Sequence, residues 1–223
     1  MKKKNIFIVG IGGSLGSAIH LFYQNRDGFN VFGSTTKSSN ISENIVYVDL
    51  LDPLSIDSMP SLELDHLIIT SGYEPQHNIQ EMKETHLNKM FGIHVIGPML
   101  LIKKISGLLR EHSSITFISS PAAWQGSYDP AYAAVKGAVN SLVRTLARDL
   151  APRTRVNAIS PSLIEFSTVY AGMTEDFKQR HIDKTLNKRL LTFEECVAGI
   201  DFILRTDHFT GQILHLNGGM IYG

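Results

Sequence analysis

Tyr132 and Lys136 are the side chains whose types and spacing first suggest chemistry, because they stand four residues apart in the segment Tyr-Ala-Ala-Val-Lys. In a helix this spacing places both side chains on one face, with their Cβ atoms about 5 to 6 Å apart. A phenol, whose ordinary pKa is about 10, is a poor acid-base catalyst at neutral pH, but a neighbouring ammonium favours the phenolate and lowers that pKa. The pair therefore predicts proton transfer to or from a bound substrate.

Two hydroxyl groups precede this pair, at Ser119 and Ser120, where an apolar run over residues 115–118 ends. We interpret the run as a strand, and groups at the carboxyl ends of strands lie where open parallel sheets bind ligands. The position of these hydroxyls strengthens the interpretation of Tyr132 and Lys136 as functional residues.

Glycines crowd the turn after the first apolar run, in the sequence Gly10-Ile-Gly12-Gly13-Ser-Leu-Gly16. The turn lies between a predicted strand over 6–9 and the first predicted helix. A tight strand-to-helix turn needs unusual backbone angles, and a pyrophosphate must approach bare N–H groups at the positive end of the helix. The turn predicts dinucleotide binding, with a purely structural turn as the alternative.

The cofactor preference depends on the end of the second predicted strand, where residues 32–38 read Phe-Gly-Ser-Thr-Thr-Lys-Ser. An enzyme that selects NAD is expected to offer an acidic side chain to the ribose diol at this place, and none is present. Hydroxyls and Lys37 suit the additional ribose phosphate of NADP better. We therefore expect NADP(H) rather than NAD(H), the alternative being a polar loop with one solvated lysine.

The elements that would position these groups alternate along the chain. Short apolar runs rich in Ile, Val and Phe predict strands over residues 6–9, 30–33, 45–48, 66–70, 114–119, 155–159 and 212–216. Helical periodicity fills most of the gaps and is clearest over 131–151, where Pro152 supplies a stop. The alternation predicts an α/β fold: a Rossmann-type, doubly wound parallel sheet of about seven strands with helices on both faces.

Composition limits the function classes. The chain has 223 residues with 21 basic and 21 acidic side chains, and 43% of its residues are hydrophobic, which argues against disorder and against a basic nucleic-acid-binding module. The single cysteine, Cys196, excludes an intramolecular disulfide and a zinc site built from several thiolates, and it fits a reducing cytoplasmic location. No metal site is expected. The longest apolar run, over 91–102, contains His94 and Pro98, so no membrane span is expected.

No repeat, low-complexity tract or linker rich in Pro, Gly or Ser divides the chain, so residues 1–223 are expected to form a single domain. Residues 162–190 have weak periodicity and mix aromatic residues with charges. They are expected either to cover the site as a substrate lid or to form an ordinary pair of surface helices.

Together these motifs resemble the short-chain dehydrogenase/reductase (SDR) family over nearly the whole chain. The resemblance is carried by the glycine turn, Val48-Asp49-Leu50, Ile118-Ser119-Ser120, Tyr132-x-x-x-Lys136, Arg155-Val156-Asn157-Ala158-Ile159-Ser160-Pro161, and the segment from Phe209-Thr210-Gly211-Gln212 to Asn217-Gly218-Gly219. It implies an oxidoreductase that transfers a hydride between a nicotinamide dinucleotide and a small-molecule carbonyl or alcohol. It also implies a homodimer or homotetramer, with helices over 93–109 and 131–150 as contact surfaces.

The resemblance implies a role for each matching residue. Tyr132 is expected to be the general acid in carbonyl reduction, and Lys136 to lower its pKa while binding the nicotinamide ribose. A serine is expected to polarise the substrate carbonyl. Ser119 stands before Tyr132 at the spacing that is commonest in the family, whereas Ser120 fits the strand-end pattern. Ser120 is favoured. Asp49 is expected to hold the adenine amino group. The expected cofactor-binding residues are Gly10, Gly13, Ser14, Leu15, Gly16, Lys37, Asp49, Leu50, Ser71, Gly72, Tyr132, Lys136, Pro161, Ser162 and Ile164. An apolar substrate pocket is expected from Trp124, Tyr128, Leu163, Phe166 and Tyr170, the alternative being ordinary packing in the core or the lid.

The sequence departs from the family pattern at several positions. His94 replaces an asparagine that anchors a water in the proton relay, and an imidazole that titrates near pH 6.5 would add pH dependence there. The alternative is a helix histidine bonded to backbone. Ile69 and Thr70 replace paired asparagines, and Ser162 replaces the glycine after Pro161.

Two alternative functions follow from these departures. The spacing of Gly10, Gly13 and Gly16 resembles that of the family's extended branch and that of dihydropteridine reductases, and the second likeness suggests a pteridine-type reductase. The altered residues at 14, 70, 94 and 162 suggest a non-catalytic dinucleotide-binding regulatory protein. Intact Tyr132, Lys136 and Ser120 argue against the second alternative, because pure binding does not require these three side chains.

Overall fold

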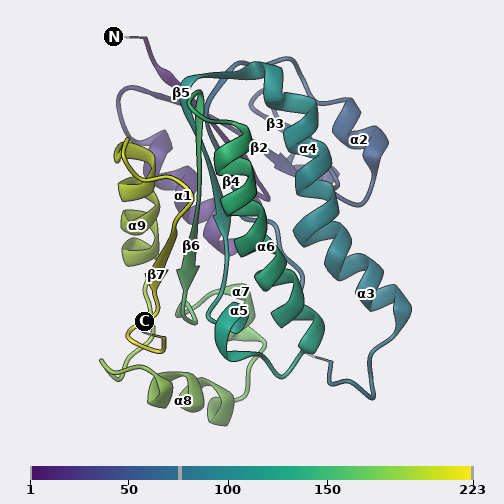
Figure 1. The fold of residues 1–223 in the computed structure, drawn as a ribbon, viewed down its shortest axis with the longest axis vertical. Coiled ribbons are helices and arrows are strands. Elements are labelled where there is room, and N and C mark those ends of the chain that lie inside the picture. Colours follow the sequence, from purple (N-terminus) through teal and green to yellow (C-terminus); the bar gives the residue numbers. More distant parts are fainter. Residues whose placement is uncertain (1, 75–76, 222–223) are drawn as a thin grey trace.

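One parallel sheet runs through the centre of the computed structural model, which describes residues 2–74 and 77–221 (Figure 1). Its seven strands are hydrogen-bonded in the order β3-β2-β1-β4-β5-β6-β7, and every pair is parallel. The chain moves outward from β1 to β3 and then returns to the other side of β1 with β4. This reversal places a ligand-binding crevice at the carboxyl ends of β1 and β4, as in other doubly wound sheets. The predicted fold class is confirmed.

Every predicted strand is present. The strands are β1 (Lys4–Val9), β2 (Phe29–Thr35), β3 (Ile45–Tyr47), β4 (Leu64–Ile69), β5 (Leu109–Ile118), β6 (Thr154–Pro161) and β7 (Ile213–Leu216). The central strands are buried on both faces, which explains why they appear in the sequence as continuous apolar runs. The main difference from prediction is β5, which begins at Leu109 rather than 114. A register shift against β4, between Leu64 and His66, accommodates this extension.

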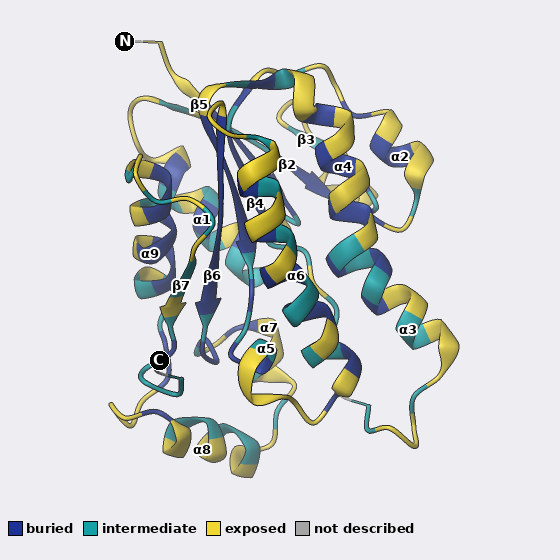
Figure 2. Cartoon of the chain, in the orientation of Figure 1, coloured by how far each residue is buried: buried dark blue, intermediate teal, exposed yellow. Residues whose placement is uncertain are grey.

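Helices cover both faces of the sheet (Figure 1). One face carries α1 (Ser14–Gln24) and α9 (Phe193–Arg205), and the other carries α2 (Pro53–Asp57), α4 (Gly97–Ile105) and α6 (Pro130–Asp149). The short helices α5 (Ala122–Gln125), α7 (Thr168–Ala171) and α8 (Glu175–Lys184) lie beyond the carboxyl ends of the strands, and η1 (Ser38–Asn40) follows β2. The inner sides of the main helices are buried, as Figure 2 shows.

Two hydrophobic cores hold the layers together. On the α1 and α9 face, the core includes Ile6, Ile8, Ile19, Val197 and Ile200. On the opposite face, it includes Phe7, Leu67, Leu101, Val139 and Val143. Alternate residues of β1 therefore enter opposite cores, and the rigid sheet between them fixes where each strand ends.

The helix that carries Tyr132 and Lys136 is fixed at its amino end. The Asp129 side chain accepts a hydrogen bond of 3.0 Å from the Tyr132 N–H, and Pro130 occupies the first turn, where a missing N–H costs nothing. Val139 and Val143 continue the buried stripe. The helix predicted over 131–151 is confirmed, and it ends at Asp149.

A second long helix is continuous from Glu84 to Leu108 and comprises α3 (Glu84–Phe91), η2 (Gly92–Ile96), α4 and η3 (Ser106–Leu108). It has 25 residues and a mean hydropathy of 1.3 over its most apolar window, so by length and composition alone it could cross a membrane, contrary to the expectation from the apolar runs. Met90, Leu101 and Ile105 are buried against the rest of the fold. We therefore interpret it as a core helix that packs on the sheet.

Residues 162–190 contain α7 and α8. None of the residues of α8 is buried, and this helix lies at the edge of the molecule (Figure 2). This shape matches the predicted pair of surface helices, and movement of the segment as a lid stays a prediction.

Candidate active site

Tyr132 and Lys136 lie on one face of α6, at the carboxyl end of β5. The Nζ of Lys136 donates a hydrogen bond of 2.8 Å to the carbonyl oxygen of Ile118, the last residue of β5, and lies 5.4 Å from the centre of the Tyr132 ring. Lys136 is buried, while Tyr132 is partly exposed. The spacing of four residues therefore brings the two side chains together as predicted.

The charge state of this pair differs from the prediction. Burial raises the pKa of Tyr132, the negative charge of Glu74 raises it further, and a hydrogen bond with Ser120 opposes the shift. Burial lowers the pKa of Lys136 to about 8, against the opposing effect of Glu74. The structure does not show the lowering expected from Lys136, because burial and the charge of Glu74 raise the pKa of the phenol instead. The phenol of Tyr132 is therefore protonated at neutral pH.

The two serines after β5 point in different directions. The Ser119 hydroxyl is buried and donates to Asn140 Oδ1 at 2.6 Å. The Ser120 hydroxyl accepts a hydrogen bond from the Ala122 N–H at 3.2 Å and approaches Tyr132 closely enough to lower its pKa. The structure thus brings Ser120, and not Ser119, to the phenol, which is the assignment favoured from the strand-end pattern.

His94 lies in η2, a π-helical turn inside the long helix. Its Nε2 is 3.1 Å from the Tyr73 nitrogen and 3.0 Å from the Tyr73 carbonyl oxygen, and its ring stands edge-on to Tyr132 with 6.1 Å between centroids. Burial, reinforced by Lys136, lowers the pKa of His94 to about 3. The expected titration near pH 6.5 is therefore wrong: the imidazole stays neutral, and it contacts backbone as the second alternative predicts. Irregular turns of this kind are frequent at functional sites.

The segment that His94 holds contains a residue that sequence reasoning missed. Glu74 is half-buried, and burial raises its pKa while Lys136 opposes the shift. The charge of Glu74 in turn affects Tyr132 and Lys136. The one signal in the sequence was its place shortly after the carboxyl end of β4, where ligand-binding groups gather in such sheets.

The glycine turn joins β1 to α1 and is shaped for close approach. Gly10 has a φ of +83°, and a Cβ there would lie 2.9 Å from the Ser71 nitrogen. A Cβ on Gly16 would lie 2.3 Å from the Gly10 carbonyl oxygen. Gly13 caps α1 without a side-chain hydrogen bond, so the first N–H groups of the helix, at Ser14, Leu15 and Gly16, face outward without a side-chain cap. This arrangement fits a dinucleotide pyrophosphate.

The same turn contacts the segment over 162–190. The Oγ of Ser14 lies 3.2 Å from the Thr168 nitrogen and 3.3 Å from the Thr168 hydroxyl, at the start of α7. The predicted cofactor-binding residue Ser14 is thus linked to the predicted lid, and Thr168 is a second residue that sequence reasoning missed.

Among the residues predicted to bind the adenosine end of the cofactor, Lys37 lies in a loop beside the glycine turn. Lys37 is exposed after β2, and its N–H donates to Thr35 Oγ1 at 3.1 Å. The Thr35 hydroxyl and the Asn40 amide nitrogen would lie 3.5 and 3.7 Å from a Cβ on Gly12, so the Lys37 loop borders the turn. Asp49 accepts a hydrogen bond of 2.9 Å from the Leu51 N–H, whereas Leu50 is buried.

The residues predicted to bind the nicotinamide end lie after β4 and β6. The Ser71 hydroxyl is buried without a partner among the described residues, and Gly72 faces the His94 ring. Pro161 ends β6, the Ser162 N–H donates to the Leu216 carbonyl at 3.1 Å, and Ile164 is buried. An unpartnered polar group in the crevice is consistent with a polar ligand there.

The predicted substrate residues lie on both sides of the strand ends. Trp124 is 40% exposed and packs edge-on against His215, while Tyr128 is 57% exposed and accepts a hydrogen bond of 3.1 Å from the Asn78 amide. Phe166 is 74% exposed and contacts the Tyr170 ring, whereas Leu163 is buried. Trp124, Tyr128 and Phe166 are thus exposed, and an apolar substrate pocket formed by these residues stays a prediction.

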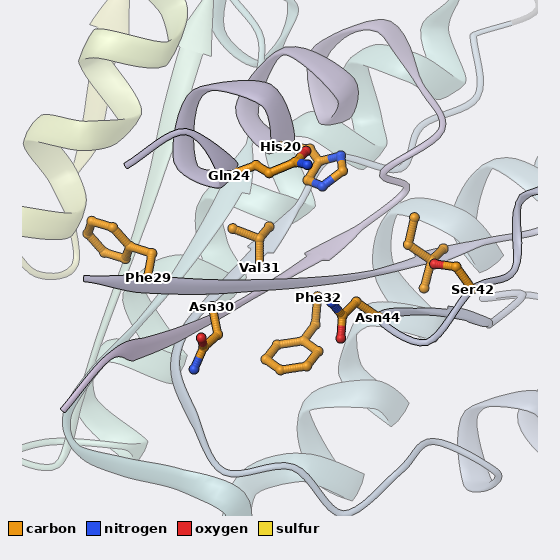
Figure 3. A pocket seen from close by; sticks show the side chains of 9 residues that line it. His20, Gln24, Phe29, Asn30, Val31, Phe32, Ser42 and Asn44 are labelled. Carbon is orange, nitrogen blue, oxygen red and sulfur yellow. The ribbon is translucent and has the colours of Figure 1, made fainter. Parts of the chain in front are cut away.

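One surface hollow lies away from this site, and another includes one of the predicted cofactor-binding residues. A surface hollow of about 390 Å³ lies between α1 and the β2–β3 edge, where His20 and Gln24 face Phe29 and Val31 (Figure 3). A smaller hollow of about 210 Å³ lies between β7 and α9 and includes Ser162. Within the described part of the chain, no group of three or more His, Cys, Asp or Glu side chains is arranged to hold a metal ion.

Comparisons with known proteins agree with this geometry. The sequence matches a family model described as enoyl-(acyl carrier protein) reductase over residues 15–221. The crystal structure of a short-chain dehydrogenase/reductase from Brucella melitensis, named as a glucose/ribitol dehydrogenase, superimposes with a TM-score of 0.87 and 26% identity, covering 100% of both chains. The chain belongs to the short-chain dehydrogenase/reductase family.

Two further comparisons bear on the function of this SDR. The dihydromonapterin reductase of Klebsiella pneumoniae is 38% identical over 140 residues, which are 60% of this chain and 57% of the relative. The match thus spans little more than half the length of that relative. A small-chain dehydrogenase crystallised with NADPH has a TM-score of 0.87 and 23% identity over 100% of both chains, which shows a common fold.

Proposed function

We propose that this SDR is an NADP(H)-dependent reductase in which Tyr132 donates a proton to the substrate. The observation that carries the proposal is that Tyr132, Lys136 and Ser120 meet at the end of β5 around a phenol whose pKa is raised by burial. A protonated phenol suits reduction, where the substrate must gain a proton.

The chemistry divides between cofactor and protein. When bound, NADPH supplies a hydride to the carbon of a C=O or C=N bond. Tyr132 gives its proton to the oxygen or nitrogen of that bond, and the Ser120 hydroxyl donates a hydrogen bond to the same atom. Lys136, which the Ile118 carbonyl orients, binds the nicotinamide ribose. His94 positions the Tyr73 backbone beside the phenol and exchanges no proton, because its pKa is about 3.

We propose a dihydropteridine as the substrate. The Klebsiella relative is named for dihydromonapterin, and the spacing of Gly10, Gly13 and Gly16 independently resembles that of dihydropteridine reductases. The C=N bond of a dihydropteridine takes the hydride at carbon and the proton at nitrogen. A carbonyl or sugar alcohol is the second candidate, favoured by the name of the Brucella protein.

The remaining parts of the proposal concern cofactor and assembly. Exposed Lys37 binds the additional ribose phosphate of NADP, and the segment over 162–190 closes over the site through the contact of Ser14 with Thr168. The helices over 93–109 and 131–150 form a homodimer or homotetramer, consistent with the exposure of Ile96 (54%) and Met99 (48%). A cytoplasmic location stays a prediction.

The test combines cofactor binding with turnover. Purified protein is titrated with NADPH and NADH by fluorescence, and NADPH oxidation is then followed with a dihydropterin, a simple ketone and a sugar aldehyde. We expect NADPH to bind more tightly and the dihydropterin to be reduced. Tyr132→Phe is expected to lower turnover by at least about a hundredfold and to leave NADPH affinity within a few-fold. Tyr47→Phe, at an exposed edge-strand position, is the matched control.

Each outcome has a definite meaning. Reduction of the ketone or sugar but not the dihydropterin replaces the pteridine substrate with the second candidate. Preference for NADH overturns the role of Lys37. Cofactor binding without turnover of any substrate supports the non-catalytic regulatory alternative, and full activity of Tyr132→Phe removes the phenol from its role.

A further inference from the structure

Asp129 is a buried carboxylate that joins the loop after β4 to the start of α6. Its Oδ1 accepts a hydrogen bond of 3.0 Å from the Tyr132 N–H in the first turn of α6, and its Oδ2 accepts one of 3.2 Å from the His77 N–H in the loop. The residue is only 2% exposed. One oxygen therefore caps the helix that carries the catalytic pair, while the other holds a residue that is 52 positions away in the sequence.

The second of these bonds is more than a helix cap requires. Asp52 caps α2 and, like Asp129, stands directly before a proline in the first turn of its helix. Its side chain accepts from the Leu54 N–H at 3.0 Å and from no other described residue. Serine, asparagine and aspartate cap helices about equally well, so a single acceptor is sufficient for a cap. The bond from Asp129 to His77 is therefore a separate contact between two distant segments.

Two further contacts hold the loop in the same place. The His77 ring stacks on the His86 ring of α3, with 4.0 Å between the ring centroids and 12° between the ring planes. The Asn78 amide nitrogen donates a hydrogen bond of 3.1 Å to the hydroxyl of Tyr128, the residue directly before Asp129. The loop is therefore held between α3 and the residues that lead into α6.

The first part of the same loop borders the phenol. The loop leaves β4 at its carboxyl end, where sheets of this kind bind ligands. The N–H and carbonyl of Tyr73 contact His94 Nε2 at 3.1 and 3.0 Å, and the Tyr73 ring belongs to the small hydrophobic cluster that contains Tyr132. Contacts with His94 thus fix the loop where it passes the phenol, and Asp129 fixes it where it approaches the start of α6.

We propose that Asp129 is a positioning residue for the reaction, and that its two oxygens set the separation between the loop after β4 and the Tyr132 phenol. The inference rests on the proposed role of Tyr132 as proton donor. Hydrogen bonds to a carboxylate are stronger than those between neutral groups, so one side chain can fix both backbones. Small displacements of reacting groups cost large factors in rate. The bond to His77 therefore supports substrate binding, and the bond to the Tyr132 N–H supports the position of the phenol.

The experiment removes one bond and keeps the other. Asp129→Ser retains an oxygen that can cap α6, but its shorter side chain cannot also reach the His77 N–H. Kinetics are measured with NADPH and whichever of the dihydropterin, the ketone and the sugar aldehyde is reduced. Asp129→Ser is expected to raise KM for that substrate at least about fivefold, with kcat within about threefold and NADPH affinity unchanged. Asp52→Ser, which replaces a cap without a second link, is the matched control and is expected to keep the native KM.

A second measurement, amide hydrogen exchange, does not depend on turnover. Asp129→Ser is expected to speed exchange of the His77 N–H at least about tenfold and to leave the Tyr132 N–H protected, because only the first loses its acceptor. Asp129→Asn has the size of the native side chain but a single acceptor oxygen, so exchange is expected to rise at one of these two amides. This variant serves if a thermal melt shows that Asp129→Ser does not fold.

The outcomes separate the inference from the proposed function. If no substrate is reduced, or if Tyr132→Phe keeps full activity, the proposed function is wrong and the positioning role falls with it. If Tyr132→Phe is inactive and Asp129→Ser keeps the native KM, the function stands and the role of Asp129 is overturned. An equal rise of KM in Asp52→Ser also overturns that role, because it indicates a general effect of losing an aspartate cap. Unchanged exchange at His77 in Asp129→Ser shows that the bond does not hold the loop.

Discussion

The hydroxyl of Ser119 donates a 2.6 Å hydrogen bond to Asn140 Oδ1, and both side chains are buried. This bond ties the end of β5 to the middle of α6, and α6 carries Tyr132 and Lys136. Ser119 therefore supports the position of α6, while the adjacent Ser120 contacts the phenol of Tyr132.

The first prediction separates these two serines. Ser119→Ala leaves the Asn140 oxygen buried without a donor and is expected to lower the free energy of unfolding by about 1 to 3 kcal/mol, measured by urea denaturation. Ser120→Ala is expected to change stability little and to lower kcat/KM by about a hundredfold. The reverse pattern, with activity lost at Ser119 and stability lost at Ser120, contradicts the assignment.

Much of the scaffold could be predicted from the sequence because its signals are local. Continuous apolar runs predict buried parallel strands, and the β1-to-α1 turn depends on Gly10 and Gly16, which no larger residue replaces without a clash. The spacing of Tyr132 and Lys136 sets their common face once a helix is assumed. These features need no knowledge of distant contacts.

The missed features depend on contacts between distant segments. The charge of Glu74 affects Tyr132, which is far away in the sequence. The spacing to Tyr132 cannot decide between Ser119 and Ser120, because the direction of each side chain depends on Asn140 and on how β5 ends. The pKa of Tyr132 depends on burial, which a pair of residues in a sequence does not reveal.

The second prediction concerns His94. Because its pKa is about 3, His94→Asn is expected to leave the shape of the pH–activity profile between about pH 5 and 8 unchanged. An asparagine can still bond the Tyr73 backbone, whereas His94→Ala cannot and is expected to lower kcat/KM with NADPH affinity retained. A step near pH 6.5 that is present in the native enzyme and absent from His94→Asn contradicts a neutral imidazole.

The third prediction concerns the alkaline limit of activity. Lys136 is charged below its pKa of about 8 and loses its charge as the pH rises through that value. We therefore expect kcat/KM to fall above about pH 8. Below that pH, kcat/KM is expected to stay constant until other groups titrate. Lys136→Arg keeps its charge throughout and is expected to be less active, since the guanidinium geometry differs, but without this alkaline decline. If Lys136→Arg shows the same alkaline decline, the decline comes from the titration of another group.

The fourth prediction uses two glycines of the same turn as a matched pair. A Cβ on Gly16 would lie 2.3 Å from the Gly10 carbonyl oxygen, a backbone atom that cannot rotate away, whereas a Cβ on Gly12 would meet only the Thr35 hydroxyl and the Asn40 amide, at 3.5 and 3.7 Å. Gly16→Ala is expected to weaken NADPH binding by more than tenfold and to destabilise the fold by about 1 to 3 kcal/mol, because the turn must open. Gly12→Ala is expected to fold normally, and any loss of NADPH affinity there reports the approach of the ligand to the outer side of the turn. Equal stability of the two variants in thermal melts would show that the turn yields at Gly16, and that its close packing against Gly10 does not fix the path of the backbone.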